Sequence, residues 1–222
     1  MQASRKSNRK LLNLKVNHIF DLDRTFFRNN VSFSFYFYLL RRGIVPYRTF
    51  PRVVQIFVRY TFGGLNLEGI HAEIFRHVLK GLRLADLEIA AEQFLSVCDR
   101  MVRPVMLQTL LEAQASGQST YLLSSSPDFL ISRIASNFSF DRFAGTNYLV
   151  DKEGKLCEIF LLITGPKKKE IAKQWVENPS SAVAYSDSFE DLSLLEWVGC
   201  PIVVCPDRKL KKHALRLFWK IL

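Results

Sequence analysis

The chain has 222 residues, of which 48% are hydrophobic and 23% are charged, and its formal net charge is +10. This length is enough for one large hydrophobic core with a small accessory lobe, and the apolar fraction excludes a disordered protein. No apolar stretch reaches the roughly 18 residues of a transmembrane helix and no signal peptide is visible, so we expect a cytoplasmic protein.

The first segment of the chain, residues 1–15, is a basic tail. It contains five basic residues and no acid, and residues 207–222 contain six basic residues and one acid, whereas the rest of the chain is balanced. Basic ends of this kind are usually solvated surface. The functional alternative is a weak contact with an anionic membrane, and we expect no stable binding of nucleic acid.

A buried strand is predicted over residues 15–20, where an apolar run that includes β-branched residues leads up to Asp21. The next segment, residues 26–105, lacks the alternation that is typical of strands. Apolar residues recur there at helical spacing, so we expect several helices, with turns near residues 43–46 and at Gly63-Gly64.

From residue 105 onward, predicted helices and strands alternate. In chain order they are a helix over 105–114, a strand over 120–123, a helix from residue 128, two strands over 143–148 and 155–163, a helix from residue 166, a strand over 182–185, a short helix after residue 191, a strand over 201–205 and a basic helix over 210–222. This alternation predicts an α/β fold with a Rossmann-like parallel sheet between two helical layers.

The first predicted strand must join that sheet, because alone it would bury nothing. The helical stretch that follows it is then an insertion that forms a lobe over the sheet. We therefore divide the chain into a basic tail (1–15), a catalytic core (16–25 and 106–222) and a helical lobe (26–105).

Polar residues follow three of the predicted strands, at the edge where ligands of open α/β sheets bind. They are Asp21 and Asp23 after the first strand, Ser124 after the second, and Asp187 and Asp191 after a later one. A run of three lysines, residues 167–169, lies near the start of a predicted helix. Carboxylates, a hydroxyl and an ammonium group that converge on one rim make a site for Mg²⁺ and a phosphate.

The spacing of Asp21 and Asp23 suits a pair of carboxylates with separate tasks. Residues i and i+2 of an extended segment point the same way, so both can face one substrate. One carboxylate can attack phosphorus and form an aspartyl-phosphate, and the other can protonate the leaving oxygen and later activate water.

Four segments, in order along the chain, resemble the signature motifs of the haloacid dehalogenase superfamily. They are residues 20–25 (Phe-Asp-Leu-Asp-Arg-Thr), 122–127 (Leu-Leu-Ser-Ser-Ser-Pro), 165–171 (Gly-Pro-Lys-Lys-Lys-Glu-Ile) and 185–192 (Tyr-Ser-Asp-Ser-Phe-Glu-Asp-Leu). The helical insertion after the first motif resembles a C1 cap. The last segment, residues 194–210, is similar to the phosphoserine-phosphatase-like subfamily IB.

The resemblance implies a role for each residue that matches a motif. The implied nucleophile is Asp21 and the implied acid/base is Asp23, whose backbone carbonyl would also face the metal. The implied Mg²⁺ site comprises Asp21, Asp23, Asp187 and Asp191, where Asp191 would support the metal or the lysine. The implied phosphate-binding residues are Thr25, Ser124, Ser125 and Lys168, with Arg24 added at the entrance.

Two assignments stay open at this point. The distance to the apolar residues of the following helix favours Lys168 as the motif lysine, but Lys167 and Lys169 are close rivals. Arg24 replaces the glycine that often follows the second aspartate of the first motif, and its guanidinium would either touch the substrate or point to solvent.

The substrate is expected to be a small phosphorylated metabolite or a lipid phosphate. Phosphoserine phosphatases carry an acid soon after the first motif to bind the substrate amine, and residues 26–30 (Phe-Phe-Arg-Asn-Asn) contain none. We therefore expect a Mg²⁺-dependent phosphatase that is not specific for phosphoserine and that takes an apolar or additionally anionic leaving group. The alternatives are a phosphotransferase that uses the same intermediate and a non-catalytic protein that binds phosphate or anionic membranes.

Overall fold

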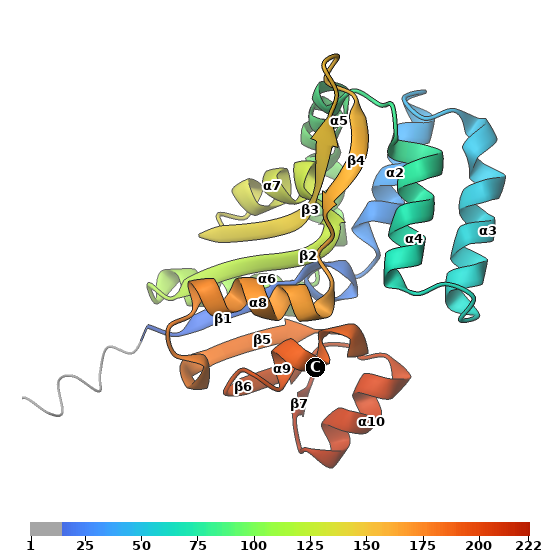
Figure 1. Cartoon of the computed structure of the whole chain (residues 1–222). Helices are drawn as coiled ribbons and strands as arrows, with labels where there is room; N and C mark the ends of the chain where they lie inside the picture. The colour runs from blue at the N-terminus through green and yellow to red at the C-terminus, as the bar shows by residue number, and fades with distance from the viewer. Residues whose placement is uncertain (1–14) are drawn as a thin grey trace, which may run out of the picture.

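A seven-stranded sheet organises the protein in the computed structural model, which describes residues 15–222. The strands are β1 (Asn17–Asp21), β2 (Ser119–Pro127), β3 (Arg142–Val150), β4 (Leu156–Leu161), β5 (Ala182–Ser186), β6 (Cys200–Val203) and β7 (Lys220–Ile221). Their order across the sheet is β4-β3-β2-β1-β5-β6-β7 (Figure 1). The basic tail of the sequence prediction, apart from Lys15, lies outside the described residues.

The central position of β1 follows from its sequence. Both faces of this strand are covered, because Phe20 packs on one side of the sheet and Ile19 on the other. It pairs in parallel with β2 and with β5, so the first strand joins the sheet as predicted. The carboxyl ends of these three strands therefore lie next to one another.

Two groups of helices cover the two faces of the sheet. The face of Phe20 packs against α6 (Pro104–Ala115) and α7 (Asp128–Asn137). The face of Ile19 packs against α8 (Gly165–Trp175), α9 (Leu192–Leu195) and α10 (Arg208–Arg216). The predicted α/β fold with three layers is confirmed.

The insertion between β1 and β2 is helical, as predicted. Its helices are α2 (Val31–Arg41), α3 (Phe50–Thr61), α4 (Leu67–Ile74), η4 (Phe75–Leu79) and α5 (Leu84–Cys98), with short turns η2 (Leu22–Phe26), η3 (Tyr47–Thr49) and η5 (Asp99–Met101) around them. Figure 1 shows α2, α3 and α4 side by side at one end of the sheet. We call residues 31–98 the helical insertion.

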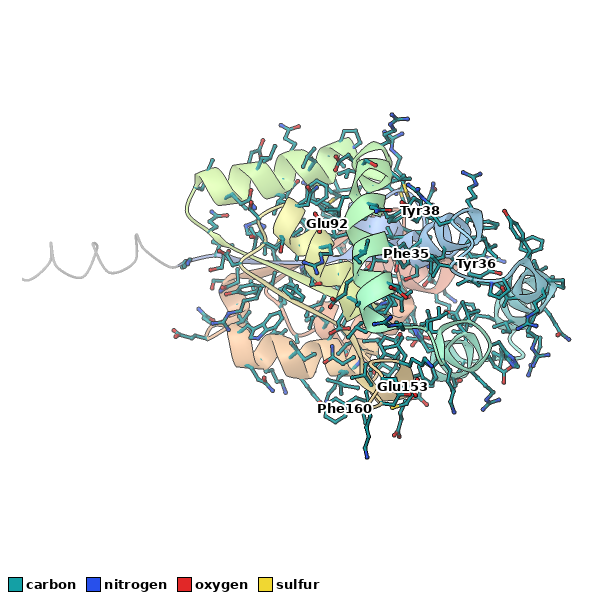
Figure 2. All side chains as sticks on the ribbon, turned by 90° about the horizontal axis from the view of Figure 1, so that it is seen from above. Phe35, Tyr36, Tyr38, Glu92, Glu153 and Phe160 are labelled. Carbon is teal, nitrogen blue, oxygen red and sulfur yellow. The ribbon has the colours of Figure 1, made fainter. Side chains whose placement is uncertain are left out.

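Aromatic side chains anchor α2 within the helical insertion. Asn30 caps the helix by accepting a hydrogen bond from the backbone N–H of Phe33. Phe35 and Tyr38 lie on the side of α2 that faces α5, where both contact Phe94 (Figure 2). The helical insertion and the Phe20 face of the sheet consequently share one hydrophobic core.

The two strands expected over residues 143–148 and 155–163 are β3 and β4. They pair antiparallel in an otherwise parallel sheet, because a tight turn at residues 151–154 returns the chain directly along its neighbour. The prediction for the end of the chain is wrong. The predicted helix over residues 210–222 ends at Arg216, because Phe218 adopts a left-handed backbone with φ of 55°. The chain after this turn pairs with β6 as the edge strand β7.

Within residues 15–222 no helix combines the length and the apolar character that crossing a bilayer requires. The cysteines at positions 98, 157, 200 and 205 are all free thiols.

Candidate active site

The carboxyl ends of β1 and β5 and the first turn of α8 meet at one rim of the sheet. Lys168 is buried there, and its Nζ lies 2.6 Å from Oδ1 of Asp21 and 2.8 Å from Oδ2 of Asp191. Burial alone would lower the pKa of Lys168, but the two carboxylates hold it above its ordinary value, so the amine is charged. One ammonium group thus bridges two aspartates, Asp21 at the end of β1 and Asp191 in the short turn that follows β5.

The neighbouring lysines do not reach this rim. Lys167 instead forms an ion pair with Glu170 on the surface of α8, at 2.8 Å. A glycine makes the approach of α8 to the rim feasible, because a Cβ at Gly165 would lie 1.7 Å from the backbone oxygen of Glu190. Of the three candidate lysines, Lys168 is the one that the fold brings to the carboxylates.

Asp187 lies at the same rim as Asp21, at the end of β5. Burial and, to a smaller extent, the negative charge of Asp21 raise the pKa of Asp187 to about 8, against the opposing effect of Arg24. Burial also raises the pKa of Asp21 to about 6, although Lys168 opposes this shift. The two carboxylates therefore repel each other, and the cations nearby do not fully compensate them.

This arrangement fits a divalent cation at Asp21 and Asp187. A hard cation such as Mg²⁺ takes one or two carboxylates and completes its shell with water and phosphate oxygens. Within residues 15–222 no group of three or more His, Cys, Asp or Glu side chains is placed to hold a metal ion. The side chain of Asp191 is instead engaged by Lys168 and by the hydroxyl of Ser186, which donates to it at 2.7 Å.

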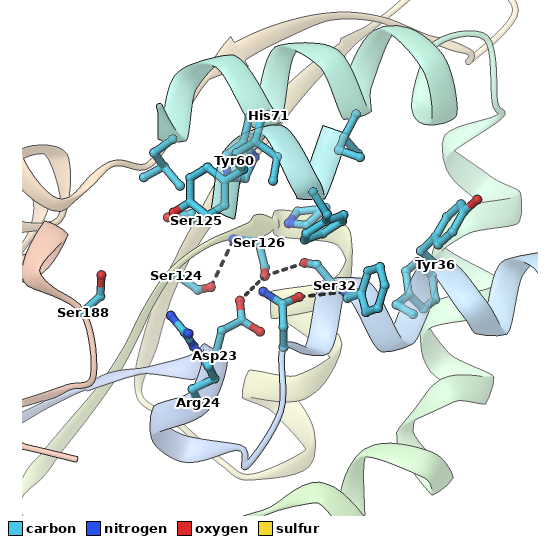
Figure 3. A pocket seen from close by; sticks show the side chains of 18 of the residues that line it. Asp23, Arg24, Ser32, Tyr36, Tyr60, His71, Ser124, Ser125, Ser126 and Ser188 are labelled. Carbon is cyan, nitrogen blue, oxygen red and sulfur yellow. Dashed lines mark hydrogen bonds between the residues drawn. The ribbon is translucent and has the colours of Figure 1, made fainter. Parts of the chain in front are cut away.

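The side chain of Asp23 is also engaged, but by the helical insertion and β2. The backbone N–H of Val31 donates to Asp23 Oδ1 at 2.5 Å, and the hydroxyl of Ser126 donates to Oδ2 at 2.8 Å. Ser32 lies 2.6 Å from Ser126, oxygen to oxygen, and extends this chain of hydroxyl groups (Figure 3). Burial raises the pKa of Asp23, and these hydrogen bonds oppose the rise.

Ser32 and Ser126 are not among the site residues that the sequence motifs indicate. A signal for Ser126 was present, because it lies two residues after Ser124 in the same extended segment and so shares its side of the strand. The hydroxyl of Ser124 is buried and accepts a hydrogen bond from the backbone N–H of Ser126. For Ser32 no such signal existed, since only the packing of α2 brings it to the site.

Arg24 adopts a left-handed backbone, with φ of 59°, at the turn between β1 and the helical insertion. Its Nε lies 3.0 Å from Oδ2 of Asp187, and 60% of its side chain is exposed. Thr25 is buried, and its hydroxyl lies 3.4 Å from the other oxygen of Asp187. Arg103 supports this turn by donating hydrogen bonds to the carbonyl oxygens of Arg24 and Thr25.

A cavity of about 370 Å³ opens from this rim toward the helical insertion. On the core side it is lined by the residues that the sequence singled out, which are Asp21, Asp23, Arg24, Ser124, Ser125, Lys168, Asp187 and Asp191. Figure 3 shows Tyr60 and His71 of the helical insertion across the cavity from Asp23 and Arg24. The volume is typical of a site for a small molecule.

Known proteins resemble the chain over nearly its whole length. A histidinol-phosphatase of Neisseria meningitidis is 26% identical over 218 residues, which cover 92% of this chain and 96% of that protein. A protein of unknown function from Bordetella pertussis matches with a TM-score of 0.83 and 21% identity, covering 95% of this chain and 99% of the other. A substrate-bound phosphoserine phosphatase matches with a TM-score of 0.64 and 20% identity, covering 94% and 100%.

At these identities the two structural matches show a common fold and no more. The family model described as haloacid dehalogenase-like hydrolase matches residues 19–196. That range runs from within β1 past the end of α9 and includes Asp21, Lys168 and Asp187. The chain therefore belongs to the haloacid dehalogenase-like hydrolase family.

Proposed function

We propose that this hydrolase is a Mg²⁺-dependent phosphatase that cleaves a small phosphomonoester through an aspartyl-phosphate. The observation that carries the proposal is the buried ammonium group of Lys168 between Asp21 and Asp191, beside Asp187 and facing one cavity. The names of the histidinol-phosphatase and the phosphoserine phosphatase support the reaction class. In this proposal residues 26–105 act as a cap over the core.

In the first step, a carboxylate oxygen of Asp21 attacks phosphorus and the bond to the alcohol oxygen breaks. The leaving oxygen takes a proton from Asp23, whose raised pKa favours a protonated carboxyl. Lys168 keeps Asp21 charged and oriented, and the hydroxyl of Ser124 holds a phosphoryl oxygen. Asp21 and Asp187 would hold Mg²⁺, which supplies positive charge for the phosphoryl oxygens when it is bound.

In the second step, the carboxylate of Asp23 takes a proton from a water molecule. The water oxygen attacks phosphorus, the bond to Asp21 breaks, and inorganic phosphate leaves. Phosphate release from p-nitrophenyl phosphate, phosphoserine, histidinol phosphate and sugar phosphates, with Mg²⁺ or with EDTA, tests the proposal. An added alcohol that captures the phosphoryl group would instead show the alternative activity of a phosphotransferase.

Replacement of Ser126 by alanine is expected to lower kcat by roughly tenfold or more, because a hydrogen bond to the charged form of Asp23 is lost. KM should change little, because the hydroxyl of Ser126 forms hydrogen bonds with Asp23 and Ser32 and is therefore not available to the substrate. Steady-state kinetics with p-nitrophenyl phosphate measure both constants. Ser132→Ala, which removes a partly buried hydroxyl that donates to a carbonyl of α7, is the matched control and should keep full activity.

A second proposal concerns the C-terminal end of the chain, where we infer a weak contact with anionic membranes. Leu215, Leu217 and Phe218 are exposed there, Phe218 by 95%, among the basic residues of α10. Apolar side chains surrounded by lysine and arginine suit a surface of anionic lipid.

Cosedimentation with phosphatidylserine-containing vesicles is expected to show binding that weakens with salt and is lost with pure phosphatidylcholine. Phe218→Ser should reduce this binding by several-fold, because the most exposed apolar side chain is removed. Equal binding of the variant would argue against the contact.

A further inference from the structure

The cavity has two chemically different sides. Every acidic residue that lines it belongs to the core, and the lysine and the arginine do too. The wall that the helical insertion supplies is mostly apolar, with Phe33, Phe57, Leu67, Ile70, Ile74 and Val78 among its residues. Its polar members, Ser32, Tyr36, Tyr60, Thr61 and His71, carry no carboxylate, ammonium or guanidinium group. The phosphoryl group belongs at Asp21, so the alcohol part of the substrate must lie against this wall.

The wall of the helical insertion offers no charge that could pair with a charged leaving group. The one titratable base on it is His71, and burial lowers the pKa of His71 to about 4, so the ring is neutral at pH 7. No hydrogen bond joins its ring to another described residue. The imidazole therefore gives a ligand one neutral donor or acceptor (Figure 3).

The charged residues of the core rim are either paired with an opposite charge or exposed to water. Arg24 is paired with Asp187, and Lys168 is paired with Asp21 and Asp191. Glu190 lines the same cavity from the core side, but its side chain is exposed to water. An ammonium or carboxylate group carried deeper into the cavity would lose its hydration without gaining a partner, which is strongly unfavourable.

We propose that the substrate is the phosphate ester of an uncharged, largely apolar alcohol, whose carbon skeleton packs against the wall of the helical insertion and whose further polar groups, if present, are neutral. The inference rests on the proposed phosphatase activity. It also separates this chain from a phosphatase for histidinol phosphate or phosphoserine, because both of those esters carry an ammonium group.

A matched pair of esters tests this directly. 3-Phenylpropyl phosphate and 2-amino-3-phenylpropyl phosphate have the same carbon skeleton and differ by one ammonium group. With Mg²⁺ at neutral pH, we expect kcat/KM for the uncharged ester to be higher by roughly 100-fold, because the charged ester must bury an unpaired ion.

A variant with a new charge on the wall tests the same inference by changing the protein instead of the substrate. Leu67 is the first residue of α4, where an aspartate is also favourable to the helix. Leu67→Asp should lower the ratio of kcat/KM for the uncharged ester to kcat/KM for the amino ester by at least about tenfold. Leu67→Asn introduces a side chain of the same size as aspartate but without charge, and it should leave the ratio unchanged. Circular dichroism would establish that both variants are folded.

The possible results distinguish a failure of the proposed uncharged substrate from a failure of the proposed phosphatase activity. Equal or faster turnover of the amino ester by the wild-type enzyme would overturn the inference while leaving the phosphatase intact. Hydrolysis of p-nitrophenyl phosphate together with inertness toward both phenylpropyl esters would overturn it as well. If no ester at all releases phosphate in the presence of Mg²⁺, the proposed phosphatase activity itself falls, and the inference falls with it.

Discussion

Replacement of Asp21 by asparagine is expected to lower phosphate release by at least about 10⁴-fold, because an amide cannot attack phosphorus and form the aspartyl-phosphate. The change preserves the size of the side chain and leaves an oxygen for Lys168, whose Nζ lies 2.6 Å away. The variant should therefore fold, and its unfolding transition measured by circular dichroism should remain cooperative. Phosphate release is followed with the best ester of the panel.

The same variant tests the metal site without relying on activity. Mg²⁺ bound to the native state raises the midpoint of thermal unfolding. The wild-type enzyme should gain stability on addition of Mg²⁺, and Asp21→Asn should gain clearly less, because one of its two proposed carboxylate ligands is neutral. Retention of phosphate release by Asp21→Asn, or an equal Mg²⁺ effect in both proteins, would contradict the assignment of Asp21.

Replacement of Lys168 by methionine is expected to abolish activity and to lower the free energy of unfolding by about 3–5 kcal/mol at neutral pH, because two buried carboxylates lose their common partner. Asp191 is 2% exposed and lies 2.8 Å from the ammonium group that is removed. Methionine has a similar length and leaves no large void. Urea unfolding in EDTA measures the loss of stability without a contribution from metal binding.

The loss caused by Lys168→Met should depend on pH in a defined direction. Lys168 opposes the rise in the pKa of Asp21, so without the ammonium group this pKa lies further above its value in the unfolded chain. The folded variant then binds protons that the unfolded chain releases, so its stability increases as the pH falls. The deficit should be largest above about pH 7 and smaller near pH 5.

Lys167→Met is the matched control for this prediction. Lys167 lies next to Lys168 in the sequence, but it pairs with Glu170 at the surface. An exposed pair of this kind contributes little to stability, because water screens the two charges. The control should therefore keep its activity and nearly all of its stability at every pH, and a loss as large as that of Lys168→Met would refute the distinction between the two lysines.

The parts of the fold that the sequence predicted well are those with strong local patterns. The apolar strand before Asp21 and the alternation of helices and strands after residue 105 define the central sheet, because burial on both faces requires continuous apolar runs. The edges were harder to predict. β7 has two residues, and its pairing with β6 depends on the left-handed turn at Phe218, which no local pattern of apolar residues indicates.

The candidate site divides in the same way. Each motif names the residues that one strand end supplies, so Asp21, Ser124 and Asp187 could be selected from sequence. The choice among three consecutive lysines needed the orientation of α8, because residues next to each other on a helix point about 100° apart. The contact of Ser32 with Ser126 could not be predicted, because it depends on the packing of α2 on the core. The two residues are nearly 100 positions apart in the chain.

The shared core of the helical insertion limits how the cavity can admit a substrate. Helix α5 packs on α7 through one continuous set of buried side chains, and Phe94 also holds α2. Backbone hydrogen bonds from Gly81 and to Leu82 tie the segment before α5 to Leu156 of β4.

The contacts just described do not involve α3, α4 or their connecting turn, so an entrance that leaves them intact would open by a movement of these two helices. Those helices carry Tyr60, Leu67 and His71. Such a movement would displace several of the residues that would contact the alcohol. The affinity for the alcohol and the rate at which the alcohol product dissociates then both depend on α3 and α4. A substitution in these helices that tightens binding of the product should therefore also slow turnover.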